Sequence, residues 1–206
     1  MIAVVDYGVG NLFSLLCSLK FIGADARVTC DAEEIRAAEG IILPGVGAFA
    51  DARAKLAATG LEPVLKEQAD AGKPFLGICL GMQMLFEKSY EYGEHEGLGF
   101  MKGEVVPFDL PKGMKVPHMG WNALNKTGDC PLLKYTADGD YVYYVHSFYV
   151  DGNSPYAAGV SDYGVKVAGA VCKGNVFGTQ FHPEKSGEVG LGILKAFSEI
   201  CKEGAL

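Results

Sequence analysis

The sequence predicts an α/β fold: a central, mostly parallel sheet with flanking helices, to which antiparallel and mixed strands are added. Through residue 90, short apolar runs alternate with segments of helical periodicity, which is typical of parallel strands joined by helices on both faces of a sheet. From Gly97 to Thr179, β-rich runs follow one another between Gly, Pro, Asn and Asp residues, which favours antiparallel and mixed strands. No linker, repeat or low-complexity tract interrupts the sequence, so we expect one domain over residues 1–206.

Apolar spacing and the residues that begin and end helices predict the individual elements. Leu12, Leu15 and Leu19 recur at helical spacing, Gly23 ends that helix, and Asp31 is suited to cap the next one. In chain order, the predicted elements are strand Ile2–Tyr7, helix Leu12–Ile22, strand Ala26–Thr29, a helix from Asp31 through Ala38, strand Gly40–Leu43, helix Leu61–Ala71, strand Phe75–Ile78, strands Gly103–Phe108, Tyr141–Tyr149, Tyr156–Val160, Lys166–Cys172 and Val176–Thr179, and helix Val189–Lys202.

Composition excludes several classes of protein. A formal net charge of −7 argues against binding of nucleic acids or anionic membranes, because both need basic surface. No apolar run approaches the ~18 residues of a membrane-spanning helix, and the N-terminal segment lacks the basic start of a signal peptide. The six cysteines form neither a disulfide framework pattern nor a Cys-x-x-Cys pair. We therefore expect a cytoplasmic protein in a reducing setting, without a metal site or a cofactor.

The segment that follows strand Phe75–Ile78 carries the strongest chemical signal. Gly77 and Gly81 flank Cys79 with one residue between, which is the Gly-x-nucleophile-x-Gly arrangement of a nucleophile elbow. A nucleophile at a sharp strand-to-helix turn occupies strained backbone, so its neighbours must be nearly free of side chain. The N–H groups of the helix that begins there favour a thiolate and can bind an oxyanion. The other five cysteines lack this context and are expected to be structural or incidental.

A cysteine nucleophile needs a base, and the base needs a group that orients it. His182 follows strand Val176–Thr179, Pro183 ends that segment, and Glu184 is near enough in sequence to accept from the imidazole. Sites in open α/β sheets form at the carboxyl ends of strands, so His182 and Cys79 are expected to meet there. His146 is the alternative base. The N–H of Leu80 and the glycine-containing loop Pro44–Gly47 are candidate oxyanion donors.

These residues resemble a known family. Gly77–Gln83 together with His182–Glu184 resembles the class I, triad-type glutamine amidotransferases, which have a flavodoxin-like fold. Five further segments are similar to those of one group in that family, the glutaminase subunits of imidazole glycerol phosphate synthases. They are Asp6–Asn11, Leu43–Phe49, Pro117–Asn122, Val145–Tyr149 and Gln180–Gly187. The resemblance covers nearly the whole chain, with no departure at a motif position.

The resemblance implies a specific chemistry. The Cys79 thiolate attacks the amide carbon of L-glutamine, His182 acts as base and then as acid toward the leaving ammonia, and Glu184 orients His182. A glutamyl thioester is then hydrolysed to glutamate. The loop at Gly47 and the Leu80 N–H would form the oxyanion hole. The remaining residues expected around bound glutamine are Gln83, Glu91, His146, Ser147 and Phe148.

The resemblance also implies a partner. Ammonia protonates in water to a poor nucleophile, so it has to be passed on without contact with solvent. In the family, the acceptor is a cyclase subunit of the (β/α)8-barrel type, which makes imidazole glycerol phosphate and aminoimidazole carboxamide ribotide in histidine biosynthesis. The two subunits form a heterodimer. Positions that match its interface are Asn11, Trp121, Tyr143 and Lys185.

Three alternative functions remain at this stage. The chain could be a glutaminase subunit that serves another acceptor synthase, although Pro117–Asn122 and the Gly45-Val46-Gly47 form of the loop argue against it. It could be a cysteine hydrolase or chaperone-like relative with the same elbow, which would not need a late His-Pro-Glu. It could also be a non-catalytic binding subunit, but Cys79, His182 and Glu184 are all present.

Overall fold

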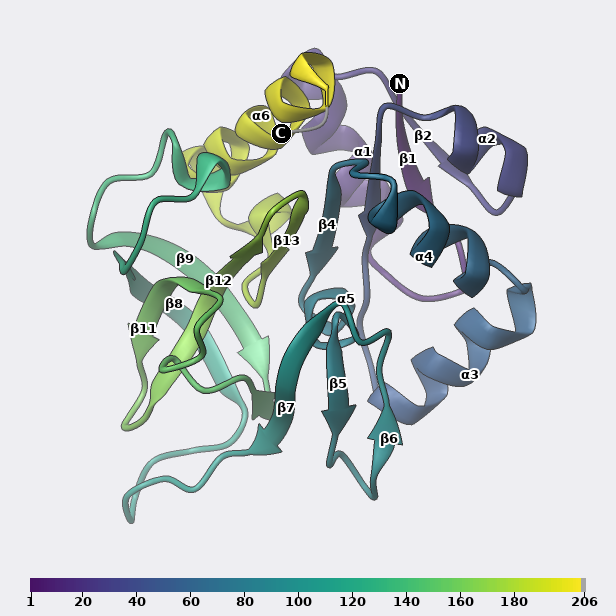
Figure 1. The fold of residues 1–206 in the computed structure, drawn as a ribbon. Coiled ribbons are helices and arrows are strands. Elements are labelled where there is room, and N and C mark those ends of the chain that lie inside the picture. The colour runs from purple at the N-terminus through teal and green to yellow at the C-terminus, as the bar shows by residue number, and fades with distance from the viewer. Residues whose placement is uncertain (205–206) are drawn as a thin grey trace.

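The computed structural model describes residues 1–204, and a large mixed sheet runs through the middle of the molecule (Figure 1). Its strand order is β2-β1-β3-β4-β13-β12-β11-β8-β9. The strands are β1 (Ile2–Val5), β2 (Ala26–Thr29), β3 (Gly40–Leu43), β4 (Phe75–Ile78), β8 (His118–Lys126), β9 (Asp140–His146), β11 (Ala157–Asp162), β12 (Lys166–Lys173) and β13 (Val176–Thr179). A smaller sheet has the order β10-β7-β5-β6. Its strands are β5 (Phe86–Ser89), β6 (His95–Glu96), β7 (Met101–Pro107) and β10 (Phe148–Tyr149).

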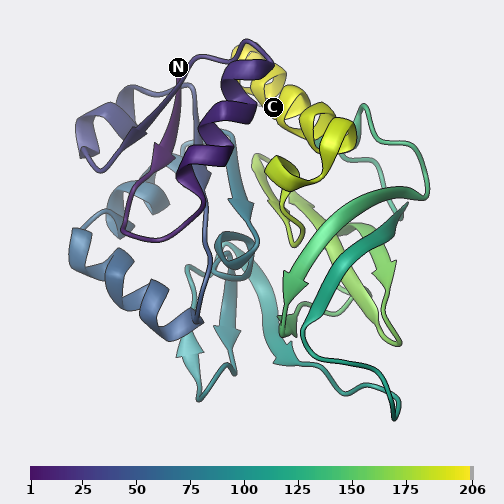
Figure 2. The same ribbon diagram turned by 180° about the vertical axis from the view of Figure 1, so that it is seen from behind.

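Helices cover both faces of the parallel part of the large sheet, as the alternating pattern predicted (Figures 1 and 2). The helices are α1 (Leu12–Phe21), α2 (Ala32–Ala37), α3 (Phe49–Thr59), α4 (Glu62–Asp70), α5 (Leu80–Gln83) and α6 (Gly187–Glu203), with two 3₁₀ turns, η1 (Pro131–Leu133) and η2 (Pro183–Lys185). Successive side chains along each strand point to opposite faces of the sheet, and they pack into two separate buried clusters. On β1, Val5 packs with residues of α2, α3 and α4, whereas Val4 packs with residues of α1 and α6.

The strand order brings distant parts of the chain together at one edge. Strands β2-β1-β3-β4-β13 pair in parallel, in the order typical of a flavodoxin-like sheet. Strand β13 therefore lies beside β4, with Thr179 opposite Ile78. Beyond β13 the pairs are antiparallel, so the strands of residues 118–173 extend the sheet as the sequence indicated. The carboxyl ends of β3, β4 and β13 lie next to one another.

Most predicted elements match the structure. Strands β5, β6 and β8 were not among them. Three further differences have physical reasons. Helix α3 was not predicted, because its sequence is mostly alanine and charged residues and its N-cap, Ala48, makes no side-chain hydrogen bond. The predicted strand Tyr141–Tyr149 is two strands, β9 and β10, which join different sheets on either side of Ser147. The helix after Cys79 is a single turn, because Met84 and Leu85 lead directly into β5.

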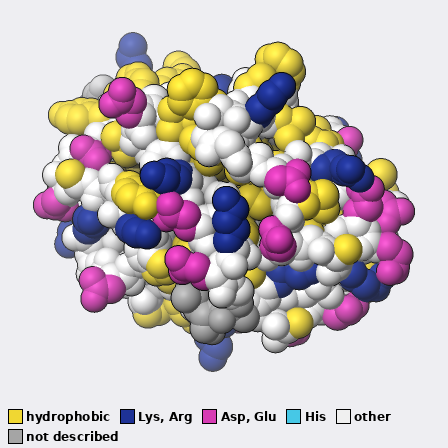
Figure 3. Space-filling model, turned by 90° about the horizontal axis from the view of Figure 1, so that it is seen from above, with side chains coloured by type: hydrophobic (Ala, Val, Ile, Leu, Met, Phe, Trp, Pro, Cys, Tyr) yellow, Lys and Arg dark blue, Asp and Glu magenta, His cyan; other side chains and the backbone are white. Residues whose placement is uncertain are grey.

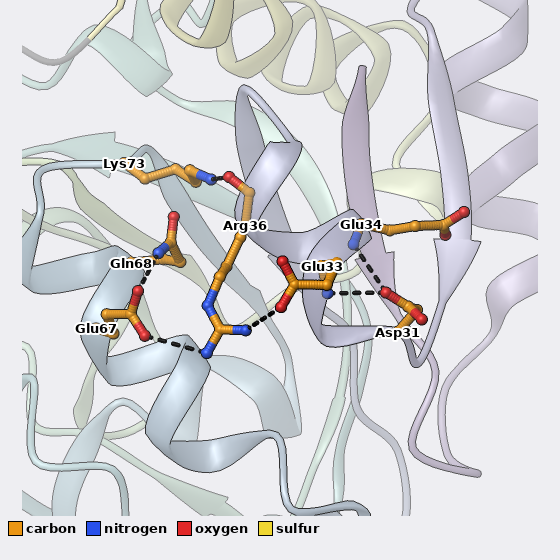
Figure 4. A network of polar contacts seen from close by, with 7 residues as sticks. All are labelled: Asp31, Glu33, Glu34, Arg36, Glu67, Gln68 and Lys73. Atoms are coloured by element: carbon orange, nitrogen blue, oxygen red, sulfur yellow. Dashed lines mark hydrogen bonds and ion pairs between the residues drawn. The ribbon is translucent and has the colours of Figure 1, made fainter.

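Polar contacts hold α2 against α4 on one face of the sheet (Figure 4). Asp31 caps α2 by accepting from the N–H groups of Glu33 and Glu34, as expected for an N-cap. Arg36 then bridges Glu33 on its own helix, at 2.6 Å, and Glu67 on α4, at 3.3 Å. These pairs are exposed, so they orient the two helices more than they stabilise the fold.

Seen from above, basic and acidic side chains are interspersed among hydrophobic ones (Figure 3). The described side chains on that face therefore form no extended region of one charge sign. Among the helices of residues 1–204, none combines the length and the apolar character needed to cross a membrane.

Candidate active site

Cys79 lies at the turn between β4 and α5 in a strained backbone conformation, with φ +54° and ψ −109°. The flanking glycines explain how so tight a turn can pack. A side chain on Gly77 would lie 2.6 Å from the Gly81 carbonyl oxygen, and one on Gly81 would overlap the Leu43 carbonyl oxygen. The structure thus has the geometry that the Gly-x-Cys-x-Gly spacing predicted.

A pocket of about 280 Å³ opens above this turn. Nine of the residues named from the sequence line it: Gly47, Cys79, Leu80, Gln83, Glu91, His146, Ser147, Phe148 and His182. Three others complete the wall: Val46, Pro117 and Val145. They come from the loop after β3, from the elbow, from the break between β9 and β10 and from the segment after β13. With Glu91 beyond β5 and Pro117 before β8, the fold therefore gathers six distant segments around one thiol.

His182 and Glu184 form a buried pair beside the pocket. His182 Nδ1 lies 2.9 Å from Glu184 Oε1, and the two side chains are only 2% and 3% exposed. Burial lowers the pKa of His182, but its contacts with Cys79 and Glu184 outweigh that effect and raise the pKa to about 10. His182 is therefore suited to carry a proton opposite a thiolate.

The Cys79 sulfur has two hydrogen-bond partners in the pocket wall besides its interaction with His182. Cys79 Sγ donates to the Val145 carbonyl at 3.9 Å and accepts from Gln180 Nε2 at 3.8 Å. His182 Nε2 has no hydrogen-bond partner among the described residues, although Cys79 is near enough to influence the pKa of His182. The free nitrogen of His182 and the Cys79 sulfur are therefore near neighbours, as proton transfer between them requires.

His146, the alternative base, has both ring nitrogens engaged. Its Nδ1 lies 2.8 Å from the Phe148 carbonyl, and its Nε2 lies 3.0 Å from His118 Nδ1. Burial, before any other cause, lowers the pKa of His146 to about 3 and that of His118 to about 4, so both rings are neutral. The imidazole with a free nitrogen beside the pocket is that of His182, which favours His182 as the base.

The direction of this imidazole chain follows from the carbonyls at its two ends. Asn122 Nδ2 donates to the Asp162 carbonyl at 2.8 Å, so its amino group also faces His118 Nε2, at 3.3 Å. His118 Nε2 is then an acceptor, and its Nδ1–H donates to His146 Nε2. His146 Nδ1–H in turn donates to the Phe148 carbonyl. The chain thereby holds the backbone of the pocket wall at Phe148.

The candidate oxyanion donors are not both free. The Leu80 N–H donates to the Gly45 carbonyl at 3.3 Å, so it is occupied in this structure. The adjoining loop is tethered at Pro44, whose carbonyl accepts from the Tyr7 hydroxyl at 2.6 Å, whereas Val46 and Gly47 are exposed. Gly47 has φ +91°, a conformation that favours glycine. For Leu80 to bind an oxyanion, the Gly45 carbonyl has to move away.

Two pocket residues make contacts beyond the pocket. Gln83 is buried, and its Nε2 donates to the Phe148 carbonyl at 2.9 Å and to Gln180 Oε1 at 3.1 Å. Glu91 Oε2 accepts from the Phe49 N–H at the start of α3, at 2.7 Å. Burial raises the pKa of Glu91 despite that hydrogen bond. Its carboxylate is therefore costly to leave unpaired and is suited to a cationic ligand group.

The four residues named for a partner interface lie outside the pocket. Trp121 is 55% exposed and packs edge to face on Tyr143, with ring centroids 6.0 Å apart, and Lys185 Nζ lies 5.9 Å from the Tyr143 ring centre. These three form one surface cluster. Asn11 precedes α1 and, with His182 and Glu184, lines a small cavity behind the pair.

Sequence reasoning missed Val145, His118 and Gln180 as neighbours of the reacting groups. Gln180 directly follows β13 and stands two residues before His182, so continuing the strand alternation past Thr179 could have placed both side chains on one side. Val145 accepts from the thiol through its backbone carbonyl, for which side-chain identity gives no signal. Within residues 1–204, no group of three His, Cys, Asp or Glu side chains is arranged to hold a metal ion.

Comparisons with known proteins identify the family of this chain. The family model of class-I glutamine amidotransferases matches residues 3–199. The chain is 55% identical to the imidazole glycerol phosphate synthase subunit HisH of Caldanaerobacter subterraneus, covering 98% of this chain and 99% of that one. It is 54% identical to the protein of the same name from Bacillus cereus, covering 98% and 96%.

Solved structures show the same fold at low identity. The structure of PurLQS from Thermotoga maritima matches with a TM-score of 0.74 at 22% identity, covering 95% of this chain and 96% of that one. A glutamine amidotransferase from the same organism matches with a TM-score of 0.60 at 17% identity, covering 89% and 75%. With the family model and the closely similar relatives, these matches show that the chain belongs to the class-I glutamine amidotransferases, in the group of the HisH subunits of imidazole glycerol phosphate synthase.

Proposed function

We propose that this chain is the glutaminase subunit of an imidazole glycerol phosphate synthase and hydrolyses L-glutamine to glutamate and ammonia. The observation that carries the proposal is the strained Cys79 elbow in a pocket of about 280 Å³ that His182 also lines, with Glu184 bonded to the far side of His182. The names of the relatives support the assignment to histidine biosynthesis. A cytoplasmic setting without a cofactor remains our prediction.

The reaction begins with the Cys79 proton held on His182, as the raised pKa of His182 favours, and the sulfur attacks the amide carbon. The carbonyl electrons move onto oxygen, which the Leu80 N–H and the backbone at Gly47 stabilise once Gly45 has released Leu80. The C–N bond then breaks, and His182 returns the proton to nitrogen so that ammonia leaves. His182 next takes a proton from water, and the resulting attack on the thioester yields glutamate and the free thiol. Glu184 keeps the imidazole oriented throughout.

Substrate binding uses the rest of the pocket. Glu91, whose carboxylate is half-buried, pairs with the α-ammonium of glutamine. Gln83, His146, Ser147 and Phe148 surround the remaining polar groups and the side-chain stem. The amide is thereby brought to Cys79 in a fixed orientation, which is the main requirement for nucleophilic attack.

The ammonia passes to a cyclase subunit of the (β/α)8-barrel type, with which the chain forms a heterodimer. Asn11, Trp121, Tyr143 and Lys185 contribute to that interface, because three of them form one partly exposed aromatic and cationic cluster and Asn11 lines the cavity behind His182. Lyase chemistry belongs to the cyclase subunit. Glutamine hydrolysis belongs to this chain.

Glutamate release with and without the cyclase subunit tests the proposal. We expect weak release alone and strong release in the complex with the cyclase ligand, because Leu80 is occupied in the free chain. Cys79→Ala should lower glutamine-dependent synthesis by roughly 10⁴-fold or more and leave ammonia-dependent synthesis intact. Cys30→Ala, at an exposed cysteine, is the control. Glutamine hydrolysis by Cys79→Ala would refute the proposal.

A further inference from the structure

Gln180 is a fully buried polar residue whose side chain reaches the nucleophile, and none of the roles above uses it. It follows β13, two residues before His182, and its exposed fraction is 0%. Its backbone N–H is already engaged, donating to the Gly169 carbonyl at 2.8 Å. A buried amide without partners would be strongly unfavourable, so the partners of its side chain define what it does.

Both ends of the Gln180 amide have partners in the site. Its Oε1 accepts from Gln83 Nε2 at 3.1 Å, and its Nε2 lies 3.8 Å from Cys79 Sγ. The orientation follows from the neighbours and needs no assumption about amide rotation. A backbone carbonyl can only accept, so the end of Gln83 that lies 2.9 Å from the Phe148 carbonyl is its amino group. That amino group selects the oxygen of Gln180, which leaves the Gln180 amino group facing the sulfur.

The anchor for this arrangement is rigid. The Phe148 carbonyl accepts from both Gln83 Nε2 and His146 Nδ1, at 2.9 and 2.8 Å. His146 is held by His118, which lies between the Tyr144 and Tyr163 rings at centroid distances of 4.6 and 3.9 Å. His118 therefore donates to His146, which donates to the Phe148 carbonyl. In a second series, Gln83 donates to the Gln180 side-chain oxygen, and the Gln180 amino group donates to the Cys79 sulfur.

We propose that Gln180 is a further catalytic residue, whose Nε2–H donates to the Cys79 sulfur and stabilises its negative charge before attack on glutamine. This inference rests on the proposed function, because it needs Cys79 to be the nucleophile. A donor aimed at sulfur strengthens when the sulfur becomes a thiolate, since hydrogen bonds to charged groups are about twice as strong as neutral ones. It also holds the sulfur beside the pocket, next to His182.

Gln180→Met tests this role, because methionine is similar in length and lacks the amide. The matched control is Gln68→Met. Gln68 is also buried, but it lies on α4 and its Nε2 donates to Glu67. In the complex with the cyclase subunit, alkylation of Cys79 by iodoacetamide at about pH 7, followed by mass spectrometry of its peptide, should slow about tenfold in Gln180→Met, as for loss of a hydrogen bond to a charged group. It should keep the wild-type rate in Gln68→Met.

Turnover provides the second readout. In Gln180→Met, kcat for glutamine should fall with little change in KM, while ammonia-dependent synthesis stays at the wild-type rate and reports an intact complex. Gln180→Asn, which keeps the amide but withdraws it from the sulfur, should show the same slowing and serves if Gln180→Met does not fold. Wild-type alkylation of Cys79 in either folded variant would overturn the inference. Failure of the proposed function would appear separately, as glutamine hydrolysis by Cys79→Ala.

Discussion

Glu184 acts on the reaction through one hydrogen bond to His182 Nδ1. Both side chains are almost completely buried, so no solvent can replace that contact. We expect Glu184→Gln to lower kcat for glutamine by about 10² to 10⁴-fold, because the imidazole loses the charge that orients it and supports its protonated form. Glutamate release by the complex measures the effect. Ammonia-dependent synthesis is the control, and an unchanged kcat would contradict the role of Glu184.

Some residues of the site could be assigned a role from the sequence, and others could not. Cys79 could be named because Gly77 and Gly81 mark its turn, and His182 because Pro183 and Glu184 mark the end of its segment. Gln180 could not, since its role depends on which way the Gln83 amide faces. The occupied state of the Leu80 N–H also depends on the course of a separate loop.

The nucleophile elbow can be tested as an element, because its two glycines are required by backbone packing. We expect Gly81→Ala to destabilise the protein by at least about 2 kcal/mol, since the added methyl group would overlap the Leu43 carbonyl oxygen and force the backbone apart. Gly128→Ala is the control, with no heavy atom within 4 Å of the added group. Urea unfolding compares the two. Equal stability of the variants would mean that the elbow is looser than described.

Helix α2 depends on its cap, which can be removed without touching the core. Asp31 is exposed and accepts from two N–H groups of the first turn (Figure 4). Asp31→Ala should lower the free energy of unfolding by about 1 kcal/mol, whereas Asp31→Asn should change it by a few tenths, because asparagine caps helices about as well. Thermal unfolding of both variants measures this. A neutral Asp31→Ala would show that packing against α4 suffices.

A helix or strand could be predicted where its buried residues form a clear pattern in the local sequence. Strands β2, β3 and β13 match their predicted bounds because they are short apolar or β-branched runs between turn residues. Helix α3 was not predicted, because only Phe49, Ala52 and Leu56 face the core and they give a weak apolar pattern. The break at Ser147 was not predicted, because the sequence on both sides has the pattern of one strand. The two parts are separate strands because they join different sheets.

For the whole molecule, two buried neutral histidines predict a dependence of stability on pH. His118 and His146 have pKa values lowered to about 4 and 3, so below about pH 6.5 the unfolded chain takes up protons that the folded chain does not. Stability should therefore fall as pH decreases from about 6.5 to 4, by up to about 1.4 kcal/mol per pH unit for each histidine. His182 acts in the opposite direction near pH 6.5, because its folded pKa is raised to about 10 while the unfolded imidazole is only partly protonated there; below about pH 5.5 it is protonated in both states and adds no slope.

Urea unfolding at several pH values measures this slope in the wild type and in His118→Asn. The variant should lose about half of the histidine contribution, because one of two such groups is gone. Carboxylates contribute equally to the pH dependence of stability in the wild type and the variant, so their effect cancels when the two slopes are subtracted. Equal slopes would mean that His118 is not held neutral in the folded protein.

Coupling to the cyclase subunit tests the surface cluster of Trp121, Tyr143 and Lys185. We expect Lys185→Ala to weaken binding of the cyclase, or its stimulation of glutamine hydrolysis, by about tenfold, as is typical of a residue that contributes strongly to an interface. Lys195→Ala is the matched control, because Lys195 lies over the ring of Tyr135 in the same way at another surface. Normal binding and normal stimulation by Lys185→Ala would show that the interface lies elsewhere.

The local pattern of residues was enough to predict an α/β fold, a cysteine elbow and a late histidine–glutamate pair. Each of these depends on sterics or hydrogen bonding among near neighbours, as with Gly77, Cys79 and Gly81. The three-dimensional arrangement was needed to place β13 beside β4, which brings His182 to Cys79, and to direct Gln180 at the sulfur. Such contacts join residues far apart in the chain. These contacts are determined by the order of the strands and by the partners of buried polar groups, and neither can be inferred from a short stretch of sequence.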